Sequence, residues 1–201
     1  MSFDNLHNQT GIRPYWRQLK SILRHKWHFM QAGRYLGVSW RQIITHDLSK
    51  FSPVEFINYS RWCYGIRSID GWAKAWLHHL HHNKHHPEYW VLSWRGDQDF
   101  YNGLGKSLTE FVTVLPMPEQ YVREMVADFM AASKMFTDSY DIAVWLNKHG
   151  PAMNLHDDTV TLLHCIMIDA GYFCTDNCDF SFMAGNEFRA WAGLPGACGA
   201  A

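Results

Sequence analysis

The sequence predicts an all-α protein in which the 201 residues form a single helical bundle. Three observations lead to this prediction. Apolar residues recur at spacings of three and four along most of the chain, which is typical of amphipathic helices. Serine, aspartate or proline stands where these stretches begin, and glycine where they end. The chain is 47% hydrophobic and has no linker or repeat, so we expect one sizeable core.

The first expected helix runs from Pro14 to Gly37 and contains two histidines near its middle. His25 shares an apolar stripe with Ile22, whereas His28 falls among polar residues. A lone histidine on an apolar face is usually a core residue with its own hydrogen bonds. If this helix supplies a metal ligand, however, that ligand should be His25.

The next expected helix, which Ser39 can cap, ends in the doublet His46-Asp47. A capping box at Ser52 starts a third helix, so Lys50 lies in the short connection between the two. Burying an unpaired charge beside the imidazole is costly, and a divalent metal bound by both side chains would remove that cost. A His-Asp dipeptide alone is more often a helix end without chemistry, so the prediction depends on further ligands.

Six of the thirteen histidines fall within residues 78–86, on an expected helix that should end before Pro87. His79 and His86 share one stripe of this helix and are the better ligand candidates, with His82 beside them in reserve. Two tryptophans and an asparagine share the stripe, namely Trp72, Trp76 and Asn83. The other histidines of the cluster point to a different side: His78, His81 and His85.

Residues 88–117 are the least helical part of the sequence. Runs of β-prone residues at 89–94 and 110–115 flank a segment rich in glycine, aspartate and asparagine. We therefore expect a short β-hairpin or a flap around residues 89–115. Loops of this length in compact domains often carry function.

A distal acid follows on the next expected helix, which Pro118 opens. Asp128 falls among core-facing positions there, and a buried aspartate needs a cation or several hydrogen-bond donors. Further helices end by Gly171, so the core should span about residues 13–171. The remainder, residues 172–201, lacks periodicity and is expected to form a loosely docked C-terminal extension.

Composition and charge narrow the class of protein. Five cysteines, an odd number, do not make a disulfide scaffold. Neither a membrane-spanning apolar run nor a signal-peptide core is present, so we expect a cytoplasmic protein, and no dedicated nucleic-acid motif occurs. Residues 11–50 carry eight Lys/Arg and one acid, whereas residues 119–201 carry four and eleven. The basic part could face a phosphorylated substrate, or it could be a solvated helix face.

The order of these residues resembles the HD superfamily of metal-dependent phosphohydrolases. Members of that superfamily share a helical fold with a first histidine, a His-Asp doublet and a distal aspartate on separate helices. His25, the doublet His46-Asp47 and Asp128 follow this order, and the segment from His46 to Lys50 is similar to the His-Asp-x-x-Lys form of several branches. Branches with two metals have extra histidines between the doublet and the distal aspartate. The resemblance implies an HD-like helical domain.

A closer resemblance, over about residues 20–170, is to a family of phage and bacterial proteins without an assigned activity. Two motifs carry most of it, HDLSKFSPxEF from His46 to Phe56 and HHPEYW from His85 to Trp90. The sequence from Glu124 to Asp128 contributes as well. This resemblance implies relatedness without implying a substrate.

The HD resemblance implies a phosphohydrolase acting on a nucleotide or a related small phosphate ester. One or two divalent transition metal ions (Mn, Fe, Co, Ni or Zn) suit such nitrogen and oxygen ligands. The first ion would take four ligands: His25, His46, Asp47 and Asp128. His79 and His86, with His82 in reserve, could bind a second ion or a phosphate oxygen.

The hypothesis of a phosphohydrolase also gives some residues roles in catalysis and substrate binding. Asp47 and Lys50 are the expected catalytic residues, and Lys50 would also pair with the phosphate. Asn83 and Glu88 are expected to bind substrate or to orient water and ligands. Three tryptophans could stack a base, although tryptophans at helical spacing are more often core residues: Trp72, Trp76 and Trp90.

Two other functions stay open. One is a metal-stabilised binding or interaction protein, for example a phage factor that acts on a host component. The other is an HD-type di-iron oxygenase, because one HD branch uses two irons with a similar ligand order. The sequence also leaves open whether the protein forms a homo-oligomer.

Overall fold

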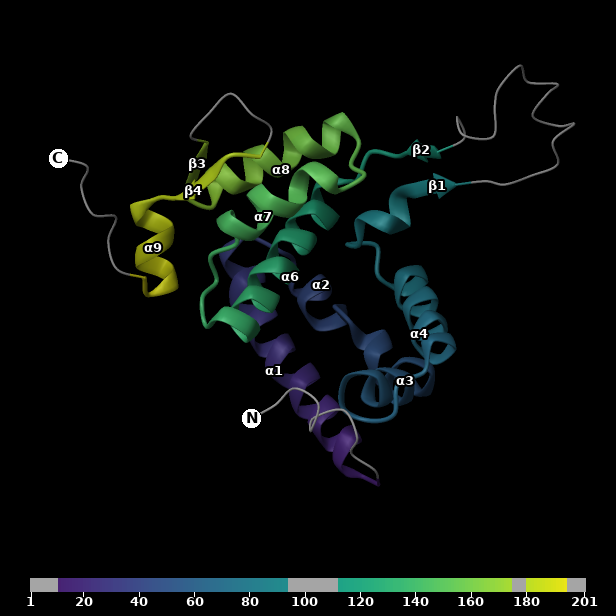
Figure 1. Ribbon diagram of the computed structural model, residues 1–201. Coiled ribbons are helices and arrows are strands. Elements are labelled where there is room, and N and C mark those ends of the chain that lie inside the picture. Colours follow the sequence, from purple (N-terminus) through teal and green to yellow (C-terminus); the bar gives the residue numbers. More distant parts are fainter. Residues whose placement is uncertain (1–10, 94–111, 175–179, 195–201) are drawn as a thin grey trace, which may run out of the picture.

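The computed structural model describes residues 11–93, 112–174 and 180–194, and helices dominate these ranges (Figure 1). Eight α-helices and two short strand pairs lie within them, which confirms the expected all-α domain. The helices are α1 (Arg13–Tyr35), α2 (Trp40–Thr45), α3 (Pro53–Tyr64), α4 (Ile69–His82), α6 (Glu119–Thr137), α7 (Ala143–His149), α8 (Asp157–Asp169) and α9 (Asn186–Ala192). Single turns of 3-10 helix form η2 (Leu48–Phe51), η3 (Pro87–Trp90) and η5 (Gly150–Ala152). No helix in the described ranges combines the length and apolar character that crossing a membrane requires.

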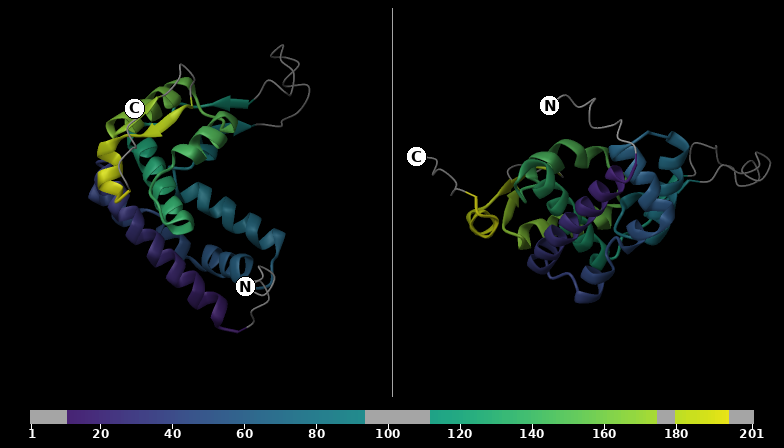
Figure 2. Two further views of the ribbon diagram at one scale, coloured as in Figure 1. Left: turned by 60° about the vertical axis from the view of Figure 1, so that its left-hand side comes forward. Right: turned by 90° about the horizontal axis from the view of Figure 1, so that it is seen from below.

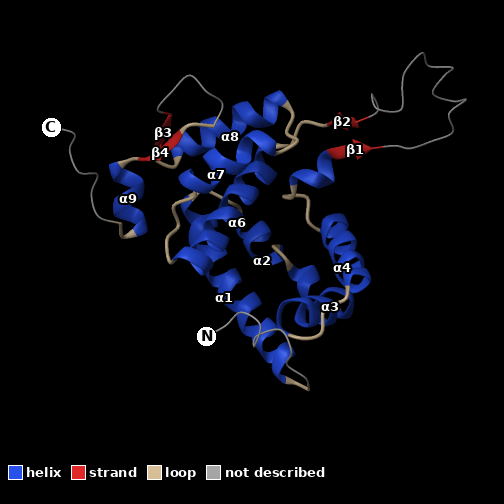
Figure 3. Cartoon of the chain, viewed as in Figure 1, coloured by secondary structure: helices blue, strands red, loops and turns tan. Residues whose placement is uncertain are grey.

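The first strand pair forms the base of the expected hairpin (Figure 3). β1 (Val91–Ser93) pairs antiparallel with β2 (Val112–Val114), and residues 94–111 lie outside the described part of the chain. The β-prone run was expected from residue 89, but Tyr89 and Trp90 belong to η3 instead. A proline begins that turn and favours a helical start over a strand.

The C-terminal extension holds more regular structure than its lack of periodicity predicts. β3 (Tyr172–Cys174) and β4 (Phe182–Ala184) form a second antiparallel pair, and α9 follows. Phe182 and Phe188 bury their side chains in the core, with 3% and 0% exposed. Three-residue strands and a seven-residue helix are too short for a hydrophobic period to show in the sequence.

The core lies where α1 packs on α6, and α1 also packs on α3 (Figure 2). Phe29 on α1, Met125 on α6 and Leu163 on α8 are each at most 1% exposed. Burying one such side chain stabilises the fold by about 1.5–3 kcal/mol. This packing fixes the two helices that carry His25 and Asp128.

The turn after α1 directs α2 back across it. Gly37 has a φ angle of +72°, a left-handed conformation that favours glycine. Gly33 is buried, and a Cβ atom there would lie 3.3 Å from Ile43 Cγ1, so α2 approaches α1 closely. As a result the end of α2 brings His46 Nε2 to within 3.4 Å of His25 Nε2.

Candidate metal centre

Four parts of the chain bring ionisable side chains together near the end of α2. They are α1, the turn after α2, the end of α4 with the segment that follows it, and α6. Two sets of four residues each place one ligand atom per residue within 4.8 Å of one another, and Asp47 belongs to both. The first set is His25, His46, Asp47 and Asp128. The second set is Asp47, His79, His85 and His86.

The first set contains the four residues that the sequence predicted as ligands of one ion. His25 Nε2 lies 2.8 Å from Asp128 Oδ1 and 3.7 Å from Asp47 Oδ2. His46 Nε2 lies 3.4 Å from Asp47 Oδ2 and 3.5 Å from Asp128 Oδ1. Phe29 stacks on the imidazole of His46, with ring centroids 3.5 Å apart and an interplanar angle of 7°. The stacking and the hydrogen bonds together hold the His46 ring in one orientation.

The second set faces the other oxygen of Asp47. His79 Nε2 lies 3.5 Å from Asp47 Oδ1 and 2.8 Å from His86 Nε2. His85 Nε2 lies 3.9 Å from the same Asp47 oxygen and 3.7 Å from Asp128 Oδ2. Asp47 therefore stands between the two sets, with Oδ2 toward the first and Oδ1 toward the second.

His85 was assigned to a different side of the helix, and the structure corrects this. The expected helix reached almost to Pro87, but α4 ends at His82, and Asn83 has extended backbone angles (φ −129°, ψ 94°). Leaving the helix at this point turns His85 inward, where only 1% of its side chain is exposed. His79 and His86 meet as predicted.

Two other predicted residues lie outside both sets. His82, the reserve ligand, is exposed, and its Nδ1 lies 2.7 Å from the carbonyl oxygen of His78. As the last residue of α4, it faces outward while the chain turns away from the helix axis. Glu88 is exposed on η3. The structure does not bring either side chain to the ligand sets.

Two buried glutamates orient the histidines from behind. Glu124 Oε1 lies 3.1 Å from His46 Nδ1, and Glu55 Oε2 lies 2.9 Å from His79 Nδ1. An ionised carboxylate only accepts hydrogen bonds, so each Nδ1 donates to its glutamate, and Nε2 is the atom that each imidazole would offer to a metal ion. His85 Nδ1 lies 3.2 Å from the same Glu124 oxygen, without a hydrogen bond.

Neither glutamate was predicted from the sequence to belong to the site. Glu124 precedes Asp128 by one helical turn and shares its face of α6, which is a signal that could have found it. Glu55 was assigned to the capping box of α3, and the Ser52 side chain does accept from its backbone N–H. Because the cap uses only the backbone N–H of Glu55, the carboxylate of Glu55 can accept a hydrogen bond from His79.

Asn83 and Lys50 take different positions around the sets. The Asn83 amide donates to Ser49 Oγ at 2.7 Å and to the His79 carbonyl at 2.8 Å, and the residue is buried. It thus supports His79 from behind. The Lys50 ammonium pairs with Asp47 Oδ2, and 24% of the Lys50 side chain is exposed, so this side chain lies at the border between the first set and solvent.

The backbone of Asp47 is held in a strained conformation. Its φ of 56° and ψ of 20° are left-handed, which costs a non-glycine residue about 1–2 kcal/mol. Lys26 stabilises the turn by donating from Nζ to the carbonyl oxygens of His46 at 2.7 Å and Ile44 at 3.2 Å. This role of Lys26 could not be predicted from the sequence, because its partners lie on another element.

Burial and neighbouring charges shift the pKa values of the residues in the two sets. Burial alone would lower the pKa of His46, but Asp47, Asp128 and Glu124 outweigh it and raise the pKa to about 9. Burial opposes ionisation of Asp47, but His46 and Lys50 hold its pKa well below the usual range. Burial and the neighbouring His85 lower the pKa of His86 to about 3, so the imidazole of His86 is neutral at pH 7.

Three buried polar atoms of the second set have no hydrogen-bond partner among the described residues. They are Asp47 Oδ1, His85 Nδ1 and His85 Nε2. A buried carboxylate oxygen without a partner is costly, and a bound cation satisfies it. Imidazole nitrogens and carboxylate oxygens are suitable ligands for transition metals. The residues present therefore fit a divalent metal ion.

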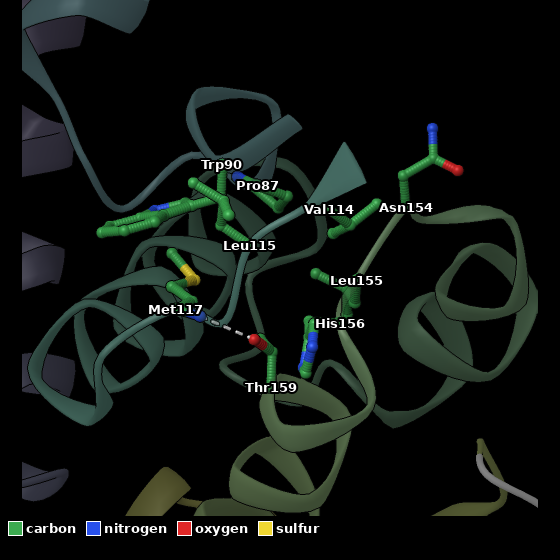
Figure 4. A pocket seen from close by; sticks show the side chains of 9 residues that line it. All are labelled: Pro87, Trp90, Val114, Leu115, Met117, Asn154, Leu155, His156 and Thr159. Carbon is green, nitrogen blue, oxygen red and sulfur yellow. Dashed lines mark hydrogen bonds between the residues drawn. The ribbon is translucent and has the colours of Figure 1, made fainter. Parts of the chain in front are cut away.

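The predicted base-stacking tryptophans lie in two places. Trp72 and Trp76 stack with centroids 6.2 Å apart, and Trp76 contacts His86 edge-on at 5.2 Å. Trp90 instead donates from Nε1 to the Lys84 carbonyl and lines a separate pocket (Figure 4). None of the residues lining that pocket belongs to either ligand set. Trp72 and Trp76 are thus the aromatic pair beside the candidate centre.

Comparison with known proteins identifies the family of the chain. Residues 15–168 match the model described as "Family of unknown function (DUF5662)", and the chain belongs to this family. Neither a curated protein nor a solved structure gives a match.

Proposed function

We propose that this member of the DUF5662 family is a metal-dependent phosphohydrolase with a binuclear centre, acting on a nucleotide or a related phosphate ester. The observation that carries the proposal is the position of Asp47 between two ligand sets, with one oxygen toward each. A carboxylate in that position can bridge two ions, and paired ions are a recurrent arrangement in phosphatases and nucleases.

The first set would hold one ion through two imidazoles and two carboxylates, and the second through three imidazoles and the shared carboxylate. Divalent ions held there supply an activated water and neutralise charge on phosphate oxygens. Glu124 and Glu55 keep the Nε2 atoms of His46 and His79 directed at the ions. The resemblance of the ligand order to the HD superfamily supports the same chemistry.

Lys50 and the tryptophan pair would recognise the substrate. The Lys50 side chain is partly exposed beside Asp47, so its ammonium could pair with a phosphate oxygen bound at the edge of the first set. Trp76 lies against His86 and stacks on Trp72, which is 36% exposed. Stacking of one base on an aromatic side chain is worth about 1–3 kcal/mol. Together they suit a ligand that joins a planar ring to a phosphate.

The test is a screen of nucleoside mono-, di- and triphosphates and cyclic nucleotides with Mn²⁺, Fe²⁺, Co²⁺, Ni²⁺ or Zn²⁺ added. We expect phosphate release that Asp47→Ala reduces at least a hundredfold. His81→Ala, which alters an exposed histidine of α4, is the matched control and should keep full activity. Activity that survives Asp47→Ala would refute the proposed site. An oxo-bridged di-iron absorption without phosphate release would favour the oxygenase instead.

One observation favours a second function, that of a metal-stabilised binding protein. The outer face of α1 exposes three large apolar side chains, Trp16 (55%), Leu23 (53%) and Trp27 (59%). Contiguous exposed apolar surface often marks an interaction site. If the protein has this second function, we expect Asp47→Ala to lower the melting temperature while the partner still binds. The substrate screen should then give no product.

A further inference from the structure

His78 and His82 form a pair of stacked imidazoles on α4, apart from the ligand sets. They are one helical turn apart, their ring centroids are 4.1 Å apart, and the interplanar angle is 19°. His82 is exposed, and 27% of the His78 side chain is exposed. Histidines at positions i and i+4 of a helix can bind one metal ion together. We propose that His78 and His82 form a separate, external site for a divalent transition metal ion.

Hydrogen bonds fix which nitrogen each imidazole offers. His82 Nδ1 lies 2.7 Å from the carbonyl oxygen of His78, and His78 Nδ1 lies 2.7 Å from Glu55 Oε1. A carbonyl oxygen and an ionised carboxylate only accept hydrogen bonds, so both Nδ1 atoms donate. In the neutral imidazoles the lone pair is then on Nε2 in both residues. Each ring therefore has Nε2 available as its ligand atom.

Glu55 connects this pair to the interior. The carboxylate is fully buried, with Oε1 bound to His78 Nδ1 and Oε2 bound to His79 Nδ1. His78 is thus oriented by the same carboxylate, and in the same manner, as His79 of the second set. A carboxylate behind an imidazole is the arrangement commonly found around metal-bound histidines. This partner distinguishes His78 from a histidine that is only solvated.

The ligand set determines the class of ion and the strength of binding. Imidazole suits Ni²⁺, Cu²⁺ and Zn²⁺, whereas Mg²⁺ and Ca²⁺ prefer oxygen ligands. The pair supplies two nitrogens, and water would complete the coordination. The external site should therefore bind more weakly than the two four-residue sets of the interior.

The experiment is a calorimetric titration of the full-length, untagged protein with Ni²⁺. We expect tight binding by the interior sets and one further, weaker event. His82→Ala should weaken that further event at least tenfold and leave the tight binding unchanged. His81→Ala, an exposed histidine one residue away on the same helix, is the matched control and should retain both. Circular dichroism checks that all variants stay folded.

The outcomes separate this site from the proposed centre. The proposal is overturned if His82→Ala titrates like the unmodified protein, or if His81→Ala loses the weak event equally. Asp47→Ala should remove the tight binding and retain the weak event, which is the expected result for two independent sites. Loss of both events in Asp47→Ala would also overturn a separate external site. If the unmodified protein shows the weak event but no tight binding, only the proposed binuclear centre is refuted.

Discussion

Asp47 is the residue on which the proposed centre depends most, because its two oxygens face different ligand sets. We predict that Asp47→Asn lowers the metal content from about two ions per chain to less than one, since both ions share the lost charge. Asparagine tolerates the left-handed conformation that Asp47 adopts, so the turn itself should persist. Elemental analysis of protein purified with added metal measures the content. Two ions retained per chain would contradict the bridging role.

Glu124 acts on the centre through the histidine that it orients. Glu124→Gln keeps the size of the side chain but removes the charge that accepts from His46 Nδ1. We predict a 10–100-fold loss of metal affinity, roughly the effect of losing such an orienting group. Competition with a chromogenic chelator measures the affinity. Glu119→Gln, at the exposed start of the same helix, is the control, and equal affinities in the two variants would disprove the role of Glu124.

At the scale of elements, the turn between α1 and α2 determines whether His46 meets His25. Gly37 has a φ of +72° with open space around it, so a substitution there is strained without a clash. We predict that Gly37→Ala lowers the free energy of unfolding by about 1 kcal/mol, because alanine disfavours this conformation. Gly37→Asn should lose less, since asparagine tolerates positive φ. Urea denaturation compares them, and equal stability of Gly37→Ala and the unmodified protein would contradict the argument.

The end of α4 shows where sequence patterns stop being sufficient. The stripe that joins His79 to His86 was predicted from helical spacing, and the two residues do meet. The proline at position 87 limits the helix but does not fix its last residue, and α4 ends at His82. That difference of a few residues decides which way His85 points. A helix boundary is set by capping and tertiary contacts, which periodicity alone does not encode.

At the scale of the molecule, the residues that could be predicted are those on strong local patterns. His25 and Asp128 stand on apolar stripes, and the order of the motifs pairs them with His46 and Asp47. Glu124 was missed because its contact with His46 joins residues 78 positions apart in the chain. Within α6 it shares a face with Asp128, but nothing local shows that its partner is His46. The members of the first set were therefore more predictable than the glutamates that orient the histidines.

At the scale of the whole molecule, removal of the metal should lower the stability of the fold. The two sets contain residues of α1, α4 and α6, so a bound metal would join elements that are far apart in sequence. A ligand that binds only the folded state at a hundredfold excess over its dissociation constant adds about 2.7 kcal/mol of stability. For a chain of 201 residues this corresponds to a fall in melting temperature of about 5–10 °C on chelation. Calorimetric melting with and without EDTA measures the shift. Asp47→Asn, which should hold less metal, should show a smaller shift. An unmodified protein whose melting temperature does not respond to EDTA would show that its elements are joined without a metal.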